Sequence, residues 1–345
     1  MERVMSELAT FFCKKSDLEV HLVLYGRAPE IFYNVPKNLF IHKPGSKFNN
    51  NFRQIATIGR LLFIRRVVID INPVSILSFG EIWNSFILLA LLGLKYRVFI
   101  SDRCSPDKNL GYVHKRLRKW LYPKASGIIT QTQKAKEIYQ NLIQGTSIKV
   151  IGNPIREISQ NQKVIRENII LTVGRLIPSK NHTKLIESFL RLNKSDWKLV
   201  IVGGDALNMT LMEELKALID KLGVGEKVIL TGNRSDVDSF YLKSKIFVLA
   251  SQSEGFPNVL GEAMSATLPV VAFDCIAGPS EMITDGKDGF LVPLFDYKLL
   301  ENRLSKLMND PELREQVGRE ANKSIRRFLV DKIGEEYYSF ITYSN

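Results

Sequence analysis

The sequence predicts an α/β fold with two domains, each built around a parallel sheet. Short apolar, β-branched segments alternate with longer amphipathic segments along the whole chain, as expected where helices connect parallel strands. The chain has 345 residues, 45% of them hydrophobic, which suits two domains with separate cores. A polar stretch over residues 152–168 separates the two halves and is the expected linker.

The elements of the first half follow from the period of the apolar residues. Strands are expected over residues 19–25, 74–79, 96–100 and 127–130, and helices over residues 2–14, 52–67, 82–92 and 111–121. The most apolar stretch, residues 86–94, has about half the length that a bilayer-spanning helix needs. We therefore expect a buried helix there.

The second half repeats the same alternation. Strands are expected over residues 169–173, 198–202, 227–230, 246–250 and 270–273, each followed by a helix. Residues 310–340 are expected to be helical.

Charge is distributed unevenly along the chain. The net charge is +12, and the excess of Lys and Arg lies entirely within residues 1–155. Lys115, Arg116, Arg118 and Lys119 alternate with leucine and tryptophan at helical spacing. This helix is either a solvated face or a surface that binds anionic membrane. No nucleic-acid recognition motif accompanies the charge, so nucleic acid is not an expected partner.

The cysteines indicate neither disulfides nor a metal site. Cys13, Cys104 and Cys275 lie far apart without metal-ligand spacing, and no secretory signal opens the sequence. We expect reduced thiols in a cytoplasmic protein.

Residues 251–265 carry the most informative pattern. Glu254 precedes a Gly-Phe-Pro turn that follows the strand expected at 246–250, and Pro257 suits the first position of a helix. Glu262 lies about one turn into that helix. A helix that starts here would present the N–H groups of Asn258 and Val259, an arrangement that attracts phosphate. Carboxylates beside a phosphate site point to sugar and ribose hydroxyls as their partners.

Glu254 and Glu262 are separated by seven residues, and this segment resembles the two-glutamate motif of retaining glycosyltransferases of family 4, which have the GT-B fold. Three further segments resemble motifs of that family in the same order, namely residues 172–182, 270–281 and 285–292. The resemblance implies two Rossmann-like, doubly wound domains that face a cleft. It places an acceptor- and membrane-facing domain at 1–155, a nucleotide-sugar domain at 156–325, and a helix that crosses back to the first domain at 326–345.

The resemblance also implies roles for the donor site. Arg175 and Lys180 would hold the diphosphate with the helix start at Asn258, and Gly174 would let the backbone approach it closely. The sequence has no Asp-x-Asp motif beside a strand, so neither a metal nor another cofactor is expected.

Glu254 would hold hydroxyls of the donor sugar and stabilise oxocarbenium charge, and Glu262 would bind the ribose. Backbone groups of Gly255, Phe256 and Pro257 would contact the sugar, although Phe256 also fits a core position. Asn233 lies in a loop that resembles the base-contacting loop. The pattern Gly203-Gly204-Asp205 departs from the family's Gly-x-Gly and is left out of the site.

On the acceptor side, residues 101–104 read Ser-Asp-Arg-Cys and resemble the Ser-Glu-Arg-Asn segment of bacterial polysaccharide-assembly enzymes, with Asp in place of Glu. Asp102 and Arg103 are the acceptor candidates. Asp102 would orient the acceptor or cap the following loop, and the sequence leaves both roles open.

The beginning of the sequence departs from the family pattern. In the family, the helix expected at residues 2–14 follows a buried strand and a glycine-rich loop, which do not precede it here. The expected explanation is a start placed roughly 15–25 residues late. The alternative is an inactive gene product.

The implied function is a retaining, metal-independent transfer of a hexosyl or N-acetylhexosaminyl group. The expected donor is a nucleotide sugar, with UDP as the expected nucleotide, and the expected acceptor is a lipid-diphosphate-linked saccharide in O-antigen, capsule or related glycan assembly. The enzyme would be cytoplasmic and peripheral on the inner face of the membrane. A catalytically impaired sugar-nucleotide-binding subunit and an epimerase of the same fold are alternatives, and the Glu254 to Glu262 motif argues against the epimerase.

Overall fold

The computed structural model describes residues 2–26, 31, 33–45, 48–106, 108–158, 164–207 and 209–343. The chain divides into two compact units. Unit 1 comprises residues 1–154 and 330–345, and unit 2 comprises residues 155–329. The chain leaves unit 1 after residue 154, one residue before the domain boundary predicted after residue 155. It returns to unit 1 at Val330, whereas the returning helix was predicted to begin at residue 326. No described helix is both long and apolar enough to span a bilayer.

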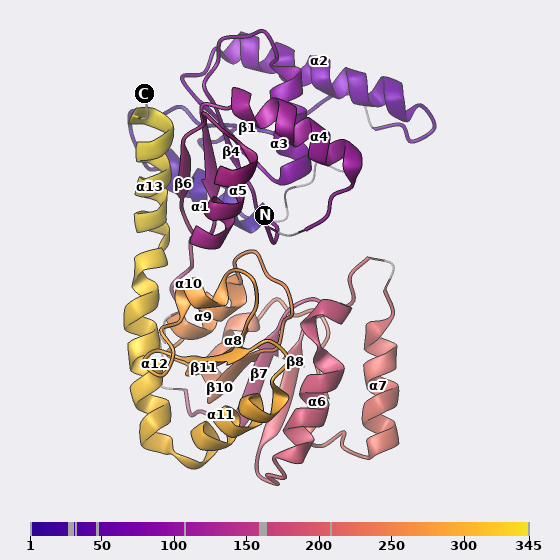
Figure 1. The fold of residues 1–345 in the computed structure, drawn as a ribbon, viewed down its shortest axis with the longest axis vertical. Coiled ribbons are helices and arrows are strands. Elements are labelled where there is room, and N and C mark those ends of the chain that lie inside the picture. The colour runs from indigo at the N-terminus through magenta and orange to yellow at the C-terminus, as the bar shows by residue number, and fades with distance from the viewer. Residues whose placement is uncertain are drawn as a thin grey trace. The chain divides into compact units, whose positions relative to one another are not determined.

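Unit 2 is a six-stranded parallel sheet with helices on both faces (Figure 1). Its strands are β7 (Ile169–Val173), β8 (Lys198–Val202), β9 (Val228–Leu230), β10 (Ile246–Leu249), β11 (Val270–Asp274) and β12 (Phe290–Pro293). Its helices are α6 (His182–Arg191), α7 (Leu211–Leu222), α8 (Val237–Lys243), α9 (Asn258–Ser265), α10 (Pro279–Met282), α11 (Tyr297–Asn309) and α12 (Pro311–Ile325). The spatial order β12-β11-β10-β7-β8-β9 is that of a doubly wound dinucleotide-binding sheet.

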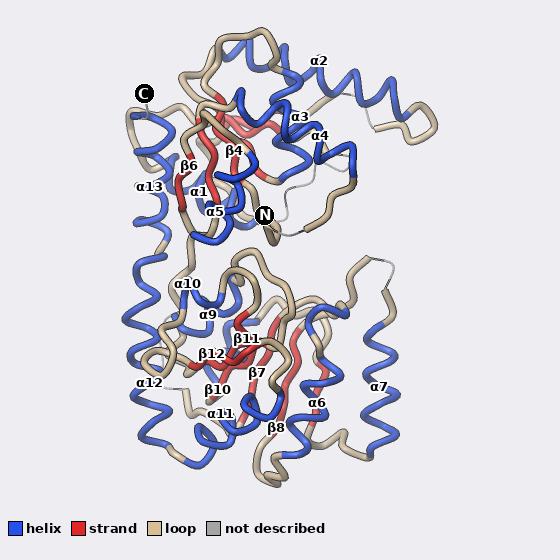
Figure 2. The backbone as a smooth tube through the Cα atoms, in the orientation of Figure 1, coloured by secondary structure: helices blue, strands red, loops and turns tan. Residues whose placement is uncertain are grey.

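Alternating side chains of the strands of unit 2 feed two separate cores. Leu199 and Ile201 of β8 join the core under α6, α7 and α11, whereas Val200 and Val202 join the core under α8, α9 and α12. Successive side chains of a strand point to opposite faces, so a continuously apolar strand is buried on both sides. The strands predicted from continuous apolar runs are apolar because both of their faces are buried. Figure 2 shows the sheet as a layer between helices.

Unit 1 contains two parallel sheets among its described residues. One pairs β1 (His21–Val23) with β2 (Phe40–His42), and the other has the order β3-β4-β5-β6. The strands of the larger sheet are β3 (Ile76–Phe79), β4 (Val98–Ser101), β5 (Gly127–Thr130) and β6 (Ile148–Val150). The helices are α1 (Glu2–Cys13), α2 (Arg53–Ile71), α3 (Glu81–Ala90), α4 (Tyr112–Leu121), α5 (Gln133–Leu142) and α13 (Val330–Tyr343).

The last helix completes the core of unit 1. Phe340 of α13 packs edge-on against Phe99 of β4, and a Cβ atom at Gly127 would lie 2.7 Å from the Phe340 ring. On the same helix, a Cβ atom at Gly334 would lie 2.5 Å from the ring of Phe11 in α1. Both glycines are therefore required by close packing. The opposite face of the sheet is covered by α2, α3, α4 and α5.

Several predicted elements differ from the structure. The strands β2, β6 and β12 were not predicted, because runs of three or four residues are too short to show a clear period. The strand expected at 19–25 is only His21–Val23. Pro257 is the N-cap of α9 instead of its first residue, so the helix begins at Asn258.

Candidate active site

The topology of unit 2 singles out one point of its sheet as the expected ligand-binding position. Strands β7 and β10 are neighbours, and the chain continues from β7 toward one edge and from β10 toward the other. In open parallel sheets, ligands bind at the carboxyl ends of the strands where the order reverses. The segments after Val173 and after Leu249 therefore define the candidate site. The other donor candidates lie in helix α9 (Asn258, Val259 and Glu262) and after β9 (Asn233), whereas Gly174, Arg175, Lys180 and Glu254 to Pro257 lie on these two segments.

Glycines hold the segment after β7 against the end of β8. The Gly174 N–H donates to the carbonyl of Val202, and the Leu176 N–H donates to the carbonyl of Gly204. A Cβ atom at Gly203 would lie 1.9 Å from the Gly174 carbonyl oxygen, and Gly203 has φ +144°. Only glycine fits this position. The glycine pair left out of the predicted site thus shapes its floor.

Three contacts join the segment after β7 to the segment after β10. The Asn181 side chain donates to the Ala250 carbonyl at 2.8 Å, and the Gln252 N–H donates to the Ser179 carbonyl at 2.9 Å. The third contact is the ion pair between Lys180 Nζ and Glu254 Oε1 at 2.5 Å. Two residues predicted to act on opposite ends of the donor thus contact each other directly.

The two charges of this pair remain accessible. The side chains of Lys180 and Glu254 are 16% and 13% exposed. Arg175, the other predicted diphosphate contact, is exposed to solvent. These side chains can therefore reach a bound molecule.

The loop before α9 is held by another glycine. A Cβ atom at Gly278 would lie 2.5 Å from Pro257 Cδ and 3.3 Å from the Gly255 carbonyl oxygen, and Gly278 has φ +102°. The loop after β11 therefore lies directly against the turn that follows Glu254. Nearby, burial and the Glu254 charge raise the pKa of Cys275 to about 11, so this thiol stays protonated.

Glu262 is buried and interacts with two side chains of unit 2. Its carboxylate accepts a hydrogen bond from the Tyr241 hydroxyl at 3.1 Å and lies 3.6 Å from Nε of Arg156. Arg156 also pairs with Asp238. Sequence reasoning placed Arg156 in the linker and missed this contact, because Arg156 and Glu262 are far apart in the sequence. A carboxylate has further acceptor capacity beyond these two partners.

The remaining predicted donor residues divide between core and surface. Phe256 is 7% exposed and packs against Phe328 with the ring centroids 5.2 Å apart, so its side chain belongs to the core. Asn233 is exposed after β9, and a Cβ atom at Gly204 would lie 2.8 Å from its amide. Asn258 and Val259 open α9 and are partly exposed.

Two buried polar side chains beside the Lys180–Glu254 pair were not predicted. His182, at the start of α6, is 3% exposed, and its ring lies against the backbone of Arg175. The Ser251 hydroxyl, after β10, is buried without a hydrogen-bond partner. Burial lowers the pKa of His182 to about 4, and the positive charge of Lys180 adds to this effect. The imidazole is therefore neutral at physiological pH.

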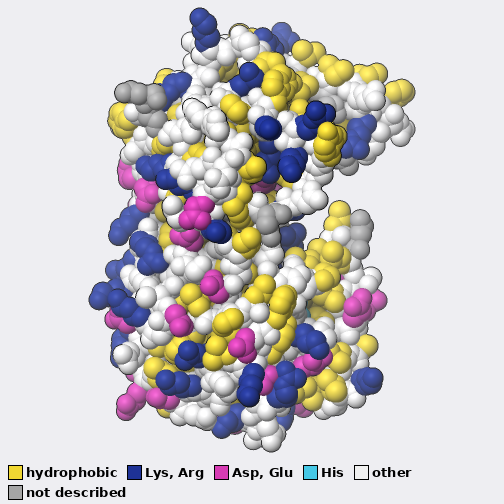
Figure 3. Space-filling model, viewed as in Figure 1, with side chains coloured by type: hydrophobic (Ala, Val, Ile, Leu, Met, Phe, Trp, Pro, Cys, Tyr) yellow, Lys and Arg dark blue, Asp and Glu magenta, His cyan; other side chains and the backbone are white. Residues whose placement is uncertain are grey.

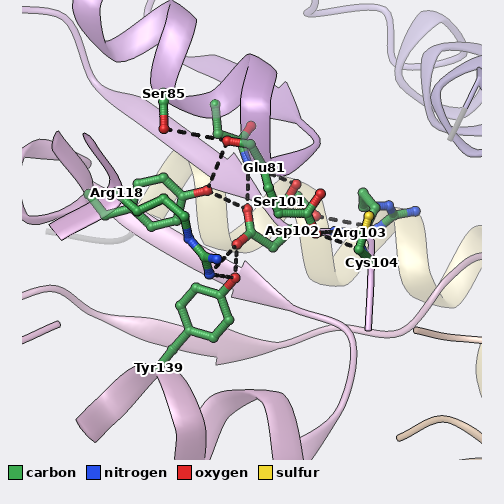
Figure 4. A network of polar contacts seen from close by, with 10 residues as sticks. Glu81, Ser85, Ser101, Asp102, Arg103, Cys104, Arg118 and Tyr139 are labelled. Atoms are coloured by element: carbon green, nitrogen blue, oxygen red, sulfur yellow. Dashed lines mark hydrogen bonds and ion pairs between the residues drawn. The ribbon is translucent and has the colours of Figure 1, made fainter. Parts of the chain in front are cut away.

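In unit 1, the predicted acceptor residue Asp102 is the centre of a buried polar network (Figure 4). The carboxylate accepts hydrogen bonds from Asn84 at 2.7 Å and Tyr122 at 2.7 Å, and a further one from Tyr139. Arg118 lies 3.4 Å away. Burial and, as the smaller cause, repulsion from the Glu81 carboxylate raise the pKa of Asp102 to about 7. Asp102 is thus positioned to hold its loop and is not presented to a ligand.

The loop after β4 is also held by a carboxylate that was not predicted. Glu81, the first residue of α3, accepts the backbone N–H groups of Arg103 at 2.8 Å and Cys104 at 2.6 Å. The Arg103 guanidinium donates to the Tyr337 hydroxyl of α13 at 3.0 Å. Arg103 is partly exposed, so it is the acceptor candidate that a ligand can reach.

One residue of the predicted membrane surface points inward. Arg118 belongs to the network around Asp102, and its side chain is 17% exposed. Helical spacing predicted the helix, but it could not show which of its cations would pair with the buried Asp102 carboxylate. Lys115, Arg116 and Lys119 of α4 are exposed. Among the residues that the structure describes, no group of three or more His, Cys, Asp or Glu is arranged to hold a metal ion.

Two proteins of Campylobacter jejuni align with nearly the whole chain. N-acetylgalactosamine-N,N'-diacetylbacillosaminyl-diphospho-undecaprenol 4-alpha-N-acetylgalactosaminyltransferase is 30% identical over 99% of this chain and 95% of its own. GalNAc-alpha-(1->4)-GalNAc-alpha-(1->3)-diNAcBac-PP-undecaprenol alpha-1,4-N-acetyl-D-galactosaminyltransferase is 26% identical over 99% of this chain and 94% of its own. Among solved structures, Anabaena HepE in complex with UDP has a TM-score of 0.81 and 16% identity, covering 99% of this chain and 95% of its own.

The two parallel-sheet units are those of the GT-B fold, which the HepE structure shares. The family described as glycosyl transferases group 1 matches residues 155–324. With the whole-chain relatives above, the chain belongs to this family. The family resemblance and the fold class predicted from the sequence are confirmed.

Proposed function

We propose that this glycosyltransferase uses a UDP-sugar donor and transfers a hexosyl or N-acetylhexosaminyl group with retention, without a metal ion. The acceptor in this proposal is a saccharide linked to a lipid through a diphosphate, and the pathway is assembly of a bacterial surface polysaccharide or related glycan. The named activities of the two Campylobacter relatives support the acceptor class. The UDP complex of HepE supports the nucleotide.

The observation that carries the proposal is the Lys180–Glu254 ion pair at the strand reversal. A donor diphosphate is a stronger partner for an ammonium group than a single carboxylate is. Its arrival would draw Lys180 away and leave the Glu254 carboxylate beside the sugar. Arg175 and the start of α9 would add positive potential for the diphosphate. The same pair thus supplies both ends of the donor site.

In the proposed reaction, the bond between the anomeric carbon and the diphosphate oxygen breaks. The acceptor oxygen bonds to that carbon from the same face, and its proton passes to the departing phosphate. Negative charge grows on the diphosphate, where Lys180 and Arg175 stabilise it. Positive charge grows on the sugar ring, where Glu254 stabilises it. Such stabilisation increases toward the transition state and therefore accelerates the step.

For the acceptor side, we propose that the exposed α4 cations Lys115, Arg116 and Lys119 attract the anionic inner leaflet, placing the enzyme at the cytoplasmic face of the membrane. Arg103 would contact the acceptor diphosphate. The Glu81 and Asp102 carboxylates support this role by holding the backbone and surroundings of the Arg103 loop.

The test is a transfer assay with UDP-hexoses and UDP-N-acetylhexosamines, using undecaprenyl-diphosphate saccharides as acceptors, in excess EDTA. Proton NMR of the early product reads its anomeric configuration. We expect transfer with the α configuration of the donor kept, and UDP binding unchanged by the chelator. An inverted product would refute retention, and a tenfold loss of UDP affinity in EDTA, about 1.4 kcal/mol, would refute metal independence. UDP binding without transfer to any acceptor would instead favour the inactive-subunit alternative.

A further inference from the structure

Helix α2 carries a stripe of exposed, large apolar side chains. Ile55, Ile58, Leu62 and Ile69 are 70%, 57%, 61% and 49% exposed. Their spacing of three, four and seven residues places them on one face of the helix. At a rise of about 1.5 Å per residue, the stripe is roughly 21 Å long. Phe52, just before the helix, is 62% exposed and extends it.

The opposite face of α2 already serves the core of unit 1. Ile64 and Val68 are buried in the cluster below the helix, and α2 packs against α3. Arg65 fastens the two helices by donating to the carbonyls of Ala90 and Leu92. The core-facing side of α2 is therefore in place, and the exposed stripe is a second apolar face of the same helix. A helix that is apolar on both sides is normally covered on both sides.

The surroundings of the stripe favour a lipid surface as its partner. Arg53 and Arg66 of α2 are exposed, and the exposed cations of α4 lie in the same unit. Figure 3 shows hydrophobic side chains along the part of unit 1 that α2 occupies in Figure 1, with Lys and Arg side chains nearby. Phe52 and Ile55 also line an open cleft of ≈ 580 Å³ at the N-terminal end of the helix. Apolar side chains flanked by arginine and lysine are the composition of helices that lie in a membrane interface.

We infer that α2 inserts its stripe of Ile55, Ile58, Leu62 and Ile69 into the headgroup boundary of an anionic bilayer. The inference rests on the proposed function only in taking the membrane as the partner of unit 1. It adds that attachment is apolar as well as electrostatic. The α4 cations raise the concentration of protein at the surface, and α2 holds it there. Attraction by cations alone is screened by salt, whereas burial of apolar side chains is not.

The experiment compares the parent chain with a stripe variant on sedimenting vesicles of phosphatidylglycerol and phosphatidylethanolamine in equal parts. The stripe variant is Ile55→Gln, Ile58→Gln, Leu62→Gln, Ile69→Gln. Glutamine is uncharged, so the net charge of the protein does not change, and it is well tolerated in helices. A matched control replaces four exposed apolar residues elsewhere, namely Leu142→Gln, Ile165→Gln, Leu207→Gln and Leu222→Gln, which are 53%, 86%, 90% and 45% exposed.

We expect the parent and the control to stay bound in about 1 M salt, where the Debye length is about 3 Å. The stripe variant should bind at low salt and be released at high salt, with a partition coefficient at least about tenfold lower. UDP binding, which unit 2 provides, should be equal in all three proteins. That measurement separates failure of this inference from failure of the proposed function.

A single tryptophan tests insertion in a chain whose Trp83, Trp120 and Trp197 are replaced by phenylalanine. In that background, Ile58→Trp should be quenched by phospholipid with brominated acyl chains, whereas Leu222→Trp should not. Binding of the stripe variant equal to that of the parent at high salt would overturn the inference. So would equal quenching at both positions. A stripe variant that loses self-association in the absence of vesicles but binds them normally would assign α2 to an interface between copies.

Discussion

The Lys180 ammonium group lies 2.5 Å from the Glu254 carboxylate, and each belongs to the segment that follows one of the two central strands of unit 2. The pair lies at the point where the strand order reverses. Because both side chains are partly exposed, the pair is able to open toward a ligand. Its charges are complementary to the two ends of a sugar nucleotide.

Replacing Glu254 with glutamine should separate catalysis from nucleotide binding. In the free protein, Glu254 neutralises Lys180, so Glu254→Gln should leave UDP affinity equal or higher. Turnover should fall by about 10²–10³, the usual effect of losing a group that stabilises transition-state charge. Lys180→Met should lower both quantities. Calorimetry with UDP and a transfer assay measure them, and Lys184→Met, a surface lysine paired with Glu187, is the control. An equal loss of affinity and turnover in Glu254→Gln would contradict the assignment.

Adding one methyl group at Gly203 should damage the site floor. The new Cβ atom would lie 1.9 Å from the Gly174 carbonyl oxygen, at a φ of +144°. Strain and overpacking should destabilise unit 2 by on the order of 3 kcal/mol and weaken UDP binding. Gly225→Ala is the control, because nothing lies within 4 Å of its Cβ position. Denaturant unfolding and UDP titration decide the matter, and matching results for the two variants would refute the role of Gly203.

Glu262→Gln should weaken nucleotide binding through the ribose. The substitution keeps the size of a side chain held by Tyr241 and Arg156 but removes its charge. We expect UDP affinity to fall about tenfold, or about 1.4 kcal/mol. A UDP analogue without the two ribose hydroxyls should bind equally to the parent and to the variant. If the variant weakens the analogue as much as UDP, the effect comes from the fold and not from the ribose contact.

Unit 2 should lose stability on mild acidification because of His182. The imidazole titrates near 6.5 in an unfolded chain, whereas burial lowers its pKa to about 4 in the folded protein. Between these values only the unfolded state binds the proton, so the unfolding free energy falls as the pH drops from about 6.5 toward 4. The full effect is about 3 kcal/mol.

The measurement is urea unfolding at pH 7 and pH 5, followed by Trp197 fluorescence. Trp83→Phe and Trp120→Phe remove the signals of unit 1. His182→Gln should flatten the dependence on pH. Equal slopes in the parent and in His182→Gln would show that another group causes the loss.

The proximity of the donor-site candidates Lys180 and Glu254 could be predicted because both follow the ends of neighbouring strands. Carboxyl ends of neighbouring parallel strands meet at one edge of a sheet, so segments after residues 173 and 249 were bound to converge. What the sequence could not show are contacts between distant segments. Arg156 with Glu262, and Gly203 against Gly174, depend on how separate strands and helices pack.

The acceptor side was less predictable for a related reason. Asp102 was recognised from its segment, but its burial depends on side chains of α3 and α5 and on Tyr122, which follows α4. Arg118 was assigned to the surface by helical spacing, yet that spacing does not say which face turns inward. The stripe on α2 escaped notice because apolar residues occupy both faces of that helix and blur its periodicity.

The return of the chain to unit 1 sets an order of events during synthesis on the ribosome. Unit 1 needs α13, whose Phe340 packs on Phe99 and whose Gly334 receives the ring of Phe11. Unit 2 is continuous from residue 155 to residue 329. Domains generally fold as units while the chain emerges. Unit 2 is therefore able to mature first, and unit 1, although its synthesis begins earlier, is complete only after α13 has left the exit tunnel.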